Sequence, residues 1–174
     1  MLKELVHHKI FENIYSKEFC EDYIKMYYKD IQRYKRTTNV VEDESINLKY
    51  YDTPFLKIFW KNCYPDYALK YSMLNKLQSH KIYDTKLQKT KPNEGYHLVH
   101  CENMEKKDSS RILAFILYLN TVEEGQTYFP EQNIKIKPEQ GKLILWPAYF
   151  THPHKGLPPK QNKYIITGWV EFGI

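Results

Sequence analysis

Two short segments of this 174-residue chain carry side chains suited to binding a metal ion. Segment 97–102, HLVHCE, holds two histidines and a glutamate, and segment 151–156, THPHKG, holds two more histidines. Alternate side chains of an extended strand share a face, so His100 and Glu102 lie together while His97 points away. A third ligand from the second segment would complete a two-histidine, one-carboxylate site, which suits Fe(II) and leaves coordination positions open.

The second segment offers two candidate ligands, because His152 and His154 are also two residues apart and strand parity does not separate them. Nine residues after His154, Lys163 opens the apolar run KYIITGWV, which predicts a strand. Alternation places four of its side chains on one face: Lys163, Ile165, Thr167 and Trp169. A lysine that faces the interior is costly unless an anion neutralises it, although a lysine at a strand end can also extend to water.

The elements that must position these residues divide the chain into a helical part and a strand-rich part. In residues 1–80, Ser16 predicts the N-cap of a helix that runs to about Tyr34, and a second helix begins near Pro65. Residues 37–53 are polar and irregular, which favours a loop. From residue 81 onward, apolar runs separated by turn residues predict strands at 84–90, 95–101, 111–120, 126–129, 133–137, 142–147 and 163–171.

This arrangement indicates a single α+β domain over residues 1–174 that is mainly β. Residues 81–174 would form a β-sandwich or jelly roll, and the helices of residues 1–80 would buttress it. The composition, 42% hydrophobic and 27% charged, is typical of a globular protein.

Charge and cysteine content bear on partners and compartment. The net charge of +5 comes mostly from dispersed lysines, so a nucleic-acid partner is compatible with the sequence but not indicated by any basic run. The three cysteines are widely spaced, which favours reduced thiols in a cytoplasmic protein. No apolar run approaches the ~18 residues of a membrane span and no secretory leader opens the sequence, so we expect no membrane association. No feature predicts an oligomeric state.

The order of these parts resembles the Fe(II)/2-oxoglutarate-dependent oxygenases, in particular their prolyl 4-hydroxylase-like branch. HCE at 100–102 is similar to the family's His-x-Asp/Glu element, and HKGLPPKQNKYIITGW at 154–169 to its distal histidine and following basic residue. Three segments between them also resemble family motifs: ILYLN at 116–120, EGQTYFPE at 124–131 and PEQGKLILW at 138–146. The resemblance spans residues 84–171 and implies a jelly roll of the double-stranded β-helix type.

Residue by residue, the resemblance implies three Fe(II) ligands: His100, Glu102 and His154. It implies that Lys163 pairs with the distal carboxylate of the cosubstrate 2-oxoglutarate, with hydrogen bonds from Tyr118 and Thr167. O2 would be the oxidant, and ascorbate would support turnover. Glu102 departs from the family's commoner aspartate, and its additional methylene shifts the carboxylate while still allowing coordination through one oxygen.

Residues beside these ligands have weaker assignments. Tyr96 and Asn103 flank the first segment and would contact the substrate, whereas Trp169 would form either cavity wall or core. His97 faces away from the ligand pair. His152 has the wrong spacing to Lys163, so we expect it to be dispensable for metal binding.

The implied activity is hydroxylation of a substrate C–H bond, with a prolyl residue of a peptide or protein as the favoured target by analogy. A small molecule or a nucleobase is an alternative substrate. Two other classes stay open: a non-catalytic jelly-roll binding module, and a cupin-like metalloenzyme that does not use 2-oxoglutarate. In the last case, Lys163 would have no anion to bind.

Overall fold

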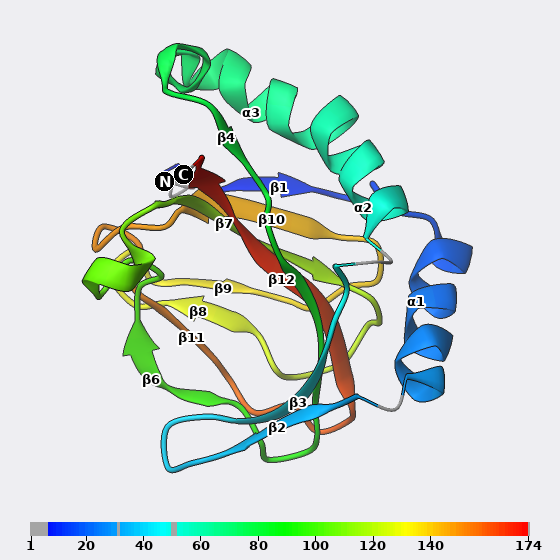
Figure 1. The fold of residues 1–174 in the computed structure, drawn as a ribbon. Helices are drawn as coiled ribbons and strands as arrows, with labels where there is room; N and C mark the ends of the chain where they lie inside the picture. The colour runs from blue at the N-terminus through cyan, green and yellow to red at the C-terminus, as the bar shows by residue number, and fades with distance from the viewer. Residues whose placement is uncertain (1–6, 31, 50–51, 174) are drawn as a thin grey trace.

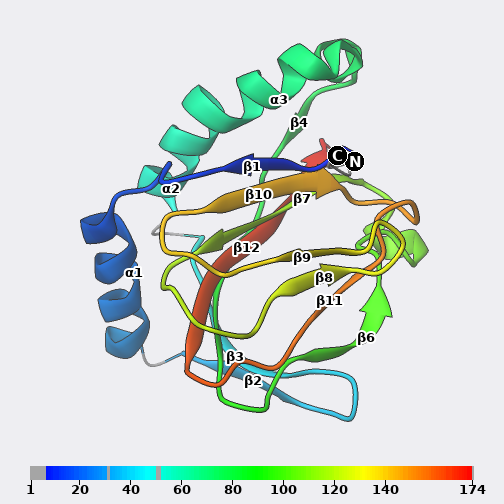
Figure 2. The same cartoon turned by 180° about the vertical axis from the view of Figure 1, so that it is seen from behind.

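The computed structural model describes residues 7–30, 32–49 and 52–173. Within them, two antiparallel sheets pack against each other, as Figure 1 and the reverse view in Figure 2 show. The large sheet has the order β1-β10-β7-β12-β5-β3-β2, and β4 also pairs with β12. Its strands are β1 (Lys9–Phe11), β2 (Tyr34–Thr37), β3 (Glu42–Asn47), β4 (His80–Lys81), β5 (Thr85–Thr90), β7 (Arg111–Tyr118), β10 (Leu143–Pro147) and β12 (Lys163–Phe172). The small sheet has the order β6-β11-β8-β9, formed by β6 (Tyr96–His100), β8 (Thr127–Phe129), β9 (Ile134–Ile136) and β11 (His154–Gly156).

The helices lie along one side of the large sheet (Figure 1). They are α1 (Lys17–Lys29), α2 (Thr53–Ile58) and α3 (Tyr64–Lys70), with a π-helical turn (Phe59–Cys63) between the last two and 3₁₀ helices at Ser72–Lys76 and Lys106–Asp108. Ser16 caps α1 as predicted, because its hydroxyl oxygen accepts a hydrogen bond from the N–H of Phe19 at 3.1 Å.

One of the predicted helix boundaries is wrong. α1 ends at Lys29 and not near Tyr34, because the backbone becomes extended at Asp30 and Tyr34 opens β2. The predicted helix start near Pro65 is confirmed by α3, which begins at Tyr64, but α2 and the π-helical turn that leads directly into α3 were not predicted. A proline in the first turn of a helix needs no hydrogen-bond partner, so Pro65 is tolerated where the geometry changes.

The predicted loop at 37–53 is wrong over its centre, where β3 pairs with β2 and β5. The sequence of β3, EDESIN, is polar because Asp43 is buried through an ion pair with Arg36 on β2. A buried carboxylate that pairs with a more exposed arginine occupies a position that a sequence pattern expects to be apolar. Residues 1–80 therefore contribute strands to the large sheet as well as helices. Residues 50–51 of the predicted loop lie outside the described residues.

Two apolar layers hold the elements together, one on each face of the large sheet. The helices pack on the outer face through side chains such as Tyr23, Phe55, Phe115 and Ile166. The two sheets meet through a smaller cluster that includes Ala114, Tyr118, Phe129, Trp146 and Ile165. Because side chains alternate along β12, its inner face is available to a cavity between the sheets. Four residues of that face line the cavity, as the alternation predicted: Lys163, Ile165, Thr167 and Trp169.

The cysteines are free thiols, as predicted. Cys20 and Cys63 are buried, and burial raises the pKa of Cys20 to about 11 and that of Cys63 to about 12. Among the described residues, no helix combines the length and the apolar character needed to cross a membrane. The cytoplasmic location stays a prediction.

Candidate active site

The three predicted metal ligands converge where β6 meets β11. His100 ends β6, His154 begins β11, and the antiparallel register sets the two residues directly opposite each other. Glu102 follows β6, and its backbone N–H donates to the carbonyl oxygen of Ala148 at 3.0 Å. One ligand atom from each residue lies within 4.8 Å of the others. The strand parity that paired His100 with Glu102 is therefore matched by the structure.

The backbone orients both imidazole rings. Nδ1 of His100 lies 3.1 Å from the carbonyl oxygen of Leu98, and Nδ1 of His154 lies 3.1 Å from that of His152. Because a carbonyl oxygen only accepts, each Nδ1 must carry the proton and donate it. Each Nε2 then presents a lone pair toward the carboxylate of Glu102, which is the tautomer that a metal ion requires.

The carboxylate of Glu102 uses its two oxygens differently. Oε1 lies 3.0 Å from Nε2 of His154 and 3.5 Å from Nε2 of His100. Oε2 accepts a hydrogen bond from the indole Nε1–H of Trp169 at 2.8 Å. Burial by itself would raise the pKa of Glu102, but in the metal-free protein His100 and His154 can also be protonated at Nε2, and their hydrogen bonds and charge in that form outweigh burial and hold the pKa of Glu102 far below its ordinary value. A bound metal ion would take the place of these protons.

The donor set fits a divalent metal ion. Two imidazole lone pairs and a carboxylate oxygen that lie this close repel one another unless a cation sits among them. Two nitrogen donors and one oxygen donor on one side of an ion are the set preferred by Fe(II) in oxygenases, with the opposite side left open. These three residues would hold that ion through Nε2 of His100, Nε2 of His154 and Oε1 of Glu102.

A cavity of about 410 Å³ adjoins the ligands, and Lys163 extends into it. The Lys163 residue is only 5% exposed, and its Nζ donates to the carbonyl oxygen of Gly125 at 2.8 Å. Burial lowers the pKa of Lys163 to about 8, with the charge of Asp43 acting in the opposite direction. An anionic ligand at this position would restore the stability of the lysine charge.

The turn that contacts Lys163 depends on Gly125. Its φ of +92° is a backbone conformation that glycine adopts readily and other residues rarely do. A Cβ at this position would lie 2.8 Å from the Cβ of Pro159, which is too close for any larger residue. The backbone geometry of this turn therefore requires the glycine at position 125.

Tyr118 and Thr127 form the wall of the same cavity. The Tyr118 hydroxyl lies 2.6 Å from Oγ1 of Thr127, and burial raises the pKa of Tyr118, so the phenol stays neutral and able to donate. Thr167 also lines the cavity, but its hydroxyl donates to the backbone carbonyl of Phe115 at 3.0 Å. In this arrangement, the proton of Thr167 is not offered to a carboxylate, and its predicted role stays a prediction.

The residues predicted to flank the site separate into two groups. Trp169 and Tyr96 line the cavity, and the Tyr96 ring stacks on the ring of His100 with centroids 3.8 Å apart. Asn103 is not among the described cavity-lining residues. Its amide instead donates to the backbone carbonyls of Ser109 and Arg111, so it holds the segment after Glu102 in place.

The comparison with known families agrees with this geometry. The family model of the 2OG-Fe(II) oxygenase superfamily, whose cosubstrate is 2-oxoglutarate, matches residues 85–171, half of the chain. The chain belongs to this superfamily. The matched segment contains the three predicted metal ligands and Lys163 with Tyr118, Gly125 and Thr127 around it.

Relatives place this oxygenase near prolyl hydroxylases. A protein of Acanthamoeba polyphaga mimivirus with the provisional name prolyl 4-hydroxylase is 32% identical over 97 residues, which are 45% of this chain and 40% of the viral protein. The viral collagen prolyl hydroxylase of Paramecium bursaria Chlorella virus-1, solved with 2-oxoglutarate, matches 99% of this chain and 100% of its own with a TM-score of 0.76 and 18% identity. A Trichoplax adhaerens prolyl hydroxylase, solved with a hypoxia-inducible-factor peptide, matches 95% of this chain and 83% of its own, with a TM-score of 0.69 and 17% identity. These two structures confirm the predicted jelly-roll fold.

Two histidines of the opening segments lie outside the ligand set of the oxygenase. The side chain of His97 points away from the ligands, as parity predicted, and its Nε2 lies 3.2 Å from a carboxylate oxygen of Glu42. His152 is buried, and its ring packs 4.9 Å from that of His8. The carbonyl oxygen of His152, and not its ring, serves the metal site by accepting from His154.

Sequence reasoning missed four basic residues that line the oxygenase cavity: Arg36, Lys86, Lys107 and Arg111. The guanidinium of Arg111 lies 3.8 Å from the ring centroid of Trp169 and donates to the carbonyl oxygen of Glu102 at 2.9 Å. Alternation along β5 does place Lys86 on the same face as Gln88 and Thr90. The pairing of β5 with β12, which brings that face to the cavity, depends on tertiary structure.

Proposed function

We propose that the protein is an Fe(II)- and 2-oxoglutarate-dependent dioxygenase that hydroxylates a C–H bond of its substrate. The strongest support is that one cavity contains both a two-histidine, one-carboxylate donor set and Lys163. Lys163 is buried, and an anion would stabilise its charge. Bound Fe(II) would supply the activation of O2, with 2-oxoglutarate converted to succinate and CO2 as one oxygen atom enters the substrate.

The residues of the chain would bind and orient the metal ion and 2-oxoglutarate and exclude water from the cavity. Lys163 would pair with the distal carboxylate of 2-oxoglutarate, and the neutral hydroxyls of Tyr118 and Thr127 would hydrogen-bond to it. Trp169 holds one oxygen of Glu102, which leaves the other oxygen for the metal. The sheets on either side of the cavity bury Lys163 and limit access of water to this end.

The substrate we favour is a prolyl residue of a peptide or protein. The mimivirus relative is named for prolyl 4-hydroxylation, and two solved structures with the same fold are prolyl hydroxylases, one of them with a peptide bound. Ascorbate would support turnover by returning oxidised iron to Fe(II).

Succinate formation tests the proposal. Purified protein would be incubated with Fe(II), ascorbate and 2-oxoglutarate, with and without proline-containing peptides, and followed for succinate and for peptides that gain one oxygen atom. We expect slow succinate release without peptide and faster release with a substrate. Lys163→Met, which removes the charge at similar side-chain length, is the matched control and should release little succinate at the same concentrations.

Failure has a clear form. If the metal-loaded protein neither binds 2-oxoglutarate nor releases succinate, it is not a 2-oxoglutarate-dependent dioxygenase, and a binding module or another metalloenzyme becomes the better reading. Oxygen gain by a small molecule or a nucleobase, but by no peptide, would retain the reaction and replace the substrate.

A further inference from the structure

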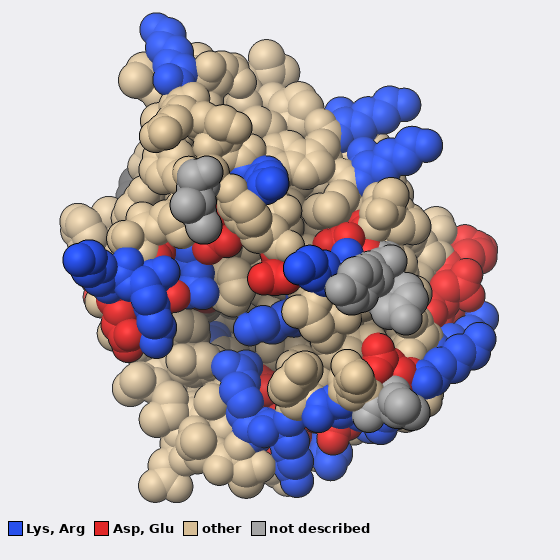
Figure 3. Space-filling model, in the orientation of Figure 1, with Lys and Arg blue, Asp and Glu red and all other residues tan. Residues whose placement is uncertain are grey.

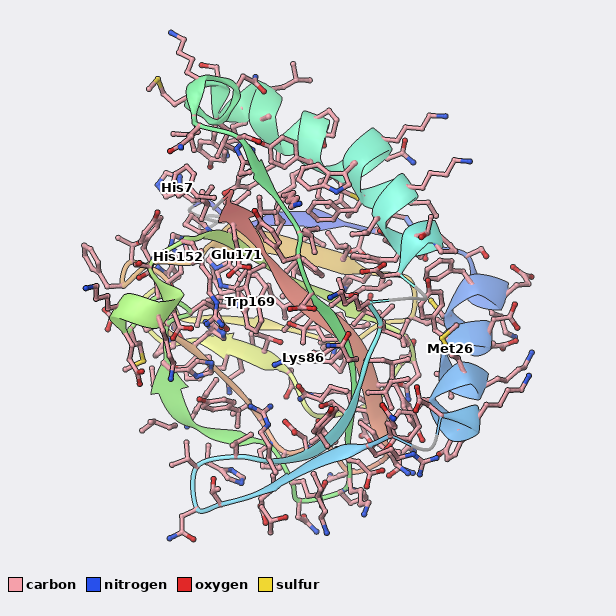
Figure 4. The ribbon with its side chains drawn as sticks, viewed as in Figure 1. His7, Met26, Lys86, His152, Trp169 and Glu171 are labelled. Carbon is pink, nitrogen blue, oxygen red and sulfur yellow. The ribbon has the colours of Figure 1, made fainter. Side chains whose placement is uncertain are left out.

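Lys86 is a cation of the cavity that has no role in the chemistry above. It lies on β5 opposite Thr167 of β12 and is partly buried. Figure 4 shows that Lys86 and Trp169 extend to the same side of the two strands, and the Nζ of Lys86 is 5.3 Å from the centroid of the Trp169 ring. The indole that it contacts is the one that donates to Glu102, so Lys86 borders the metal site.

The other described cations of the cavity are already paired. Their partners are Asp43 for Arg36, Asp108 and Glu171 for Arg111, Glu105 for Lys107, and the carbonyl oxygen of Gly125 for Lys163. Among the described residues, the Lys86 side chain has neither a hydrogen-bond acceptor nor an ion-pair partner, and its Nζ lies over the Trp169 ring. Figure 3 shows how Lys, Arg, Asp and Glu side chains intermix on this face of the molecule.

The surroundings make an uncompensated Lys86 costly. Burial lowers the pKa of Lys86, and the charges of Arg36 and Arg111 lower it further, against opposing effects of Asp43 and Asp84. The contact with an aromatic face compensates only part of this cost. A carboxylate delivered to this position by a ligand would gain a charge-assisted hydrogen bond at a site that the protein leaves open.

We infer that Lys86 is the anchor for a carboxylate group of the substrate, so that the substrate class is an acidic peptide or an amino acid with a free carboxylate. This inference rests on the proposed function and specifies its substrate. A single free cation suits a single carboxylate. A nucleic-acid backbone would instead need several unpaired cations along a path, whereas both described arginines of the cavity are bound to carboxylates.

Matched peptides test the inference without turnover. Protein loaded with redox-inert Zn(II) and saturated with 2-oxoglutarate would be titrated with short proline peptides blocked at both ends, in pairs that differ only by Glu or Gln beside the proline. Peptides with a free C-terminal carboxylate and free L-proline form a second arm, which tells a side-chain carboxylate from an α-carboxylate. Binding would be followed by calorimetry.

We expect at least one carboxylate-bearing probe to bind about tenfold tighter than its neutral partner. Lys86→Met should remove that preference and leave affinity for 2-oxoglutarate unchanged. Lys89→Met is the matched control, because it removes the same charge from the same strand but on the face that packs toward Tyr28, and it should keep the preference.

Three results would overturn the inference. The first is equal or absent binding of charged and neutral probes by the wild-type protein. The second is a loss of 2-oxoglutarate affinity in Lys86→Met, which would make Lys86 part of the cosubstrate site. The third is tighter binding of a short single-stranded oligonucleotide than of any acidic peptide. In all three cases, succinate release by the wild-type protein would still support the proposed function, and its absence would remove both.

Discussion

Lys163 and Lys86 enter one cavity from neighbouring strands, and their surroundings show that the two ends of the cavity are built for different ligands. At the closed end, Lys163 is 5% exposed and touches the carbonyl oxygen of Gly125, near the hydroxyls of Tyr118 and Thr127. At the open end, Lys86 is more exposed and lies among charged groups. An enclosed cation suits a small ligand that is the same in every turnover, whereas an open, charged rim suits a larger ligand that varies.

Both ends of the cavity adjoin the metal ligands, so replacing a ligand should have the largest effect of the changes considered. His154→Ala removes one of two nitrogen donors, and we expect metal affinity to fall by more than about a hundredfold. This exceeds the loss that is typical when a residue hydrogen-bonded to a metal ligand is replaced. His152→Ala should change it little, because the carbonyl oxygen that holds His154 belongs to the backbone and survives the substitution. Anaerobic calorimetry with Fe(II) measures both. The opposite ranking of the two variants would overturn the ligand assignment.

Lys163→Met should separate the two ends. Without the charge, the closed end loses its only buried cation facing the cosubstrate, and affinity for 2-oxoglutarate should fall by about a hundredfold. Metal affinity should stay within about twofold, because Lys163 contacts no ligand atom. Lys86→Met is the comparison variant, and titration of the Zn(II)-loaded proteins gives all three values. Equal losses of 2-oxoglutarate affinity in the two variants would mean that the cavity has one anion site and not two.

Trp169→Phe tests whether the indole N–H at the open end contributes to metal affinity. The substitution retains a ring under Arg111 but removes the N–H that holds Oε2 of Glu102, so we expect metal affinity to fall about tenfold. In a Glu102→Asp background, the shorter carboxylate no longer reaches the indole, and Trp169→Phe should have little further effect. Metal titration of the four proteins measures this coupling. Equal losses in both backgrounds would show that Trp169 acts through packing alone.

The closed end was more predictable from the sequence than the open end, for a physical reason. Lys163 sits on a long apolar strand, where alternation alone assigns its face, and the same alternation paired His100 with Glu102 between the two ends. Lys86 reaches the cavity only because β5 pairs with β12, and strand pairing is a tertiary property.

Two other elements, β3 and α2, were also not predicted from the sequence. β3 shows no apolar alternation, since Asp43 is buried by pairing with Arg36 across two strands. The start of α2 was missed because the π-helical turn joins it to α3, and such a turn has no strong sequence signature. Local periodicity therefore predicted the elements with apolar faces, but not a strand with a buried, ion-paired carboxylate or a helix joined to the next by a π-helical turn.

The smallest expected effect is a pH dependence confined to the closed end. Because the pKa of Lys163 is lowered to about 8, the ligand-free protein loses the proton on Lys163 as pH rises through that value. Binding a dicarboxylate needs the protonated lysine, so affinity for 2-oxoglutarate should fall about fivefold between pH 8 and pH 9. Calorimetry on Zn(II)-loaded protein measures it, and a dependence that persisted in Lys163→Met would assign the titration to another group.

The same pKa fixes the sign of a stability change in the ligand-free protein. The folded-state pKa lies below the unfolded value of roughly 10.4, so the unfolded chain binds more protons between these limits. The contribution of Lys163 is therefore unfavourable below pH 8, and the free energy of unfolding should rise relative to Lys163→Met as pH increases from 8 to 10. Saturating 2-oxoglutarate should abolish that rise, because the bound carboxylate restores the lysine charge. Denaturant titrations of both proteins with and without 2-oxoglutarate measure the difference, and a fall in stability over this range would show that the buried lysine is already compensated.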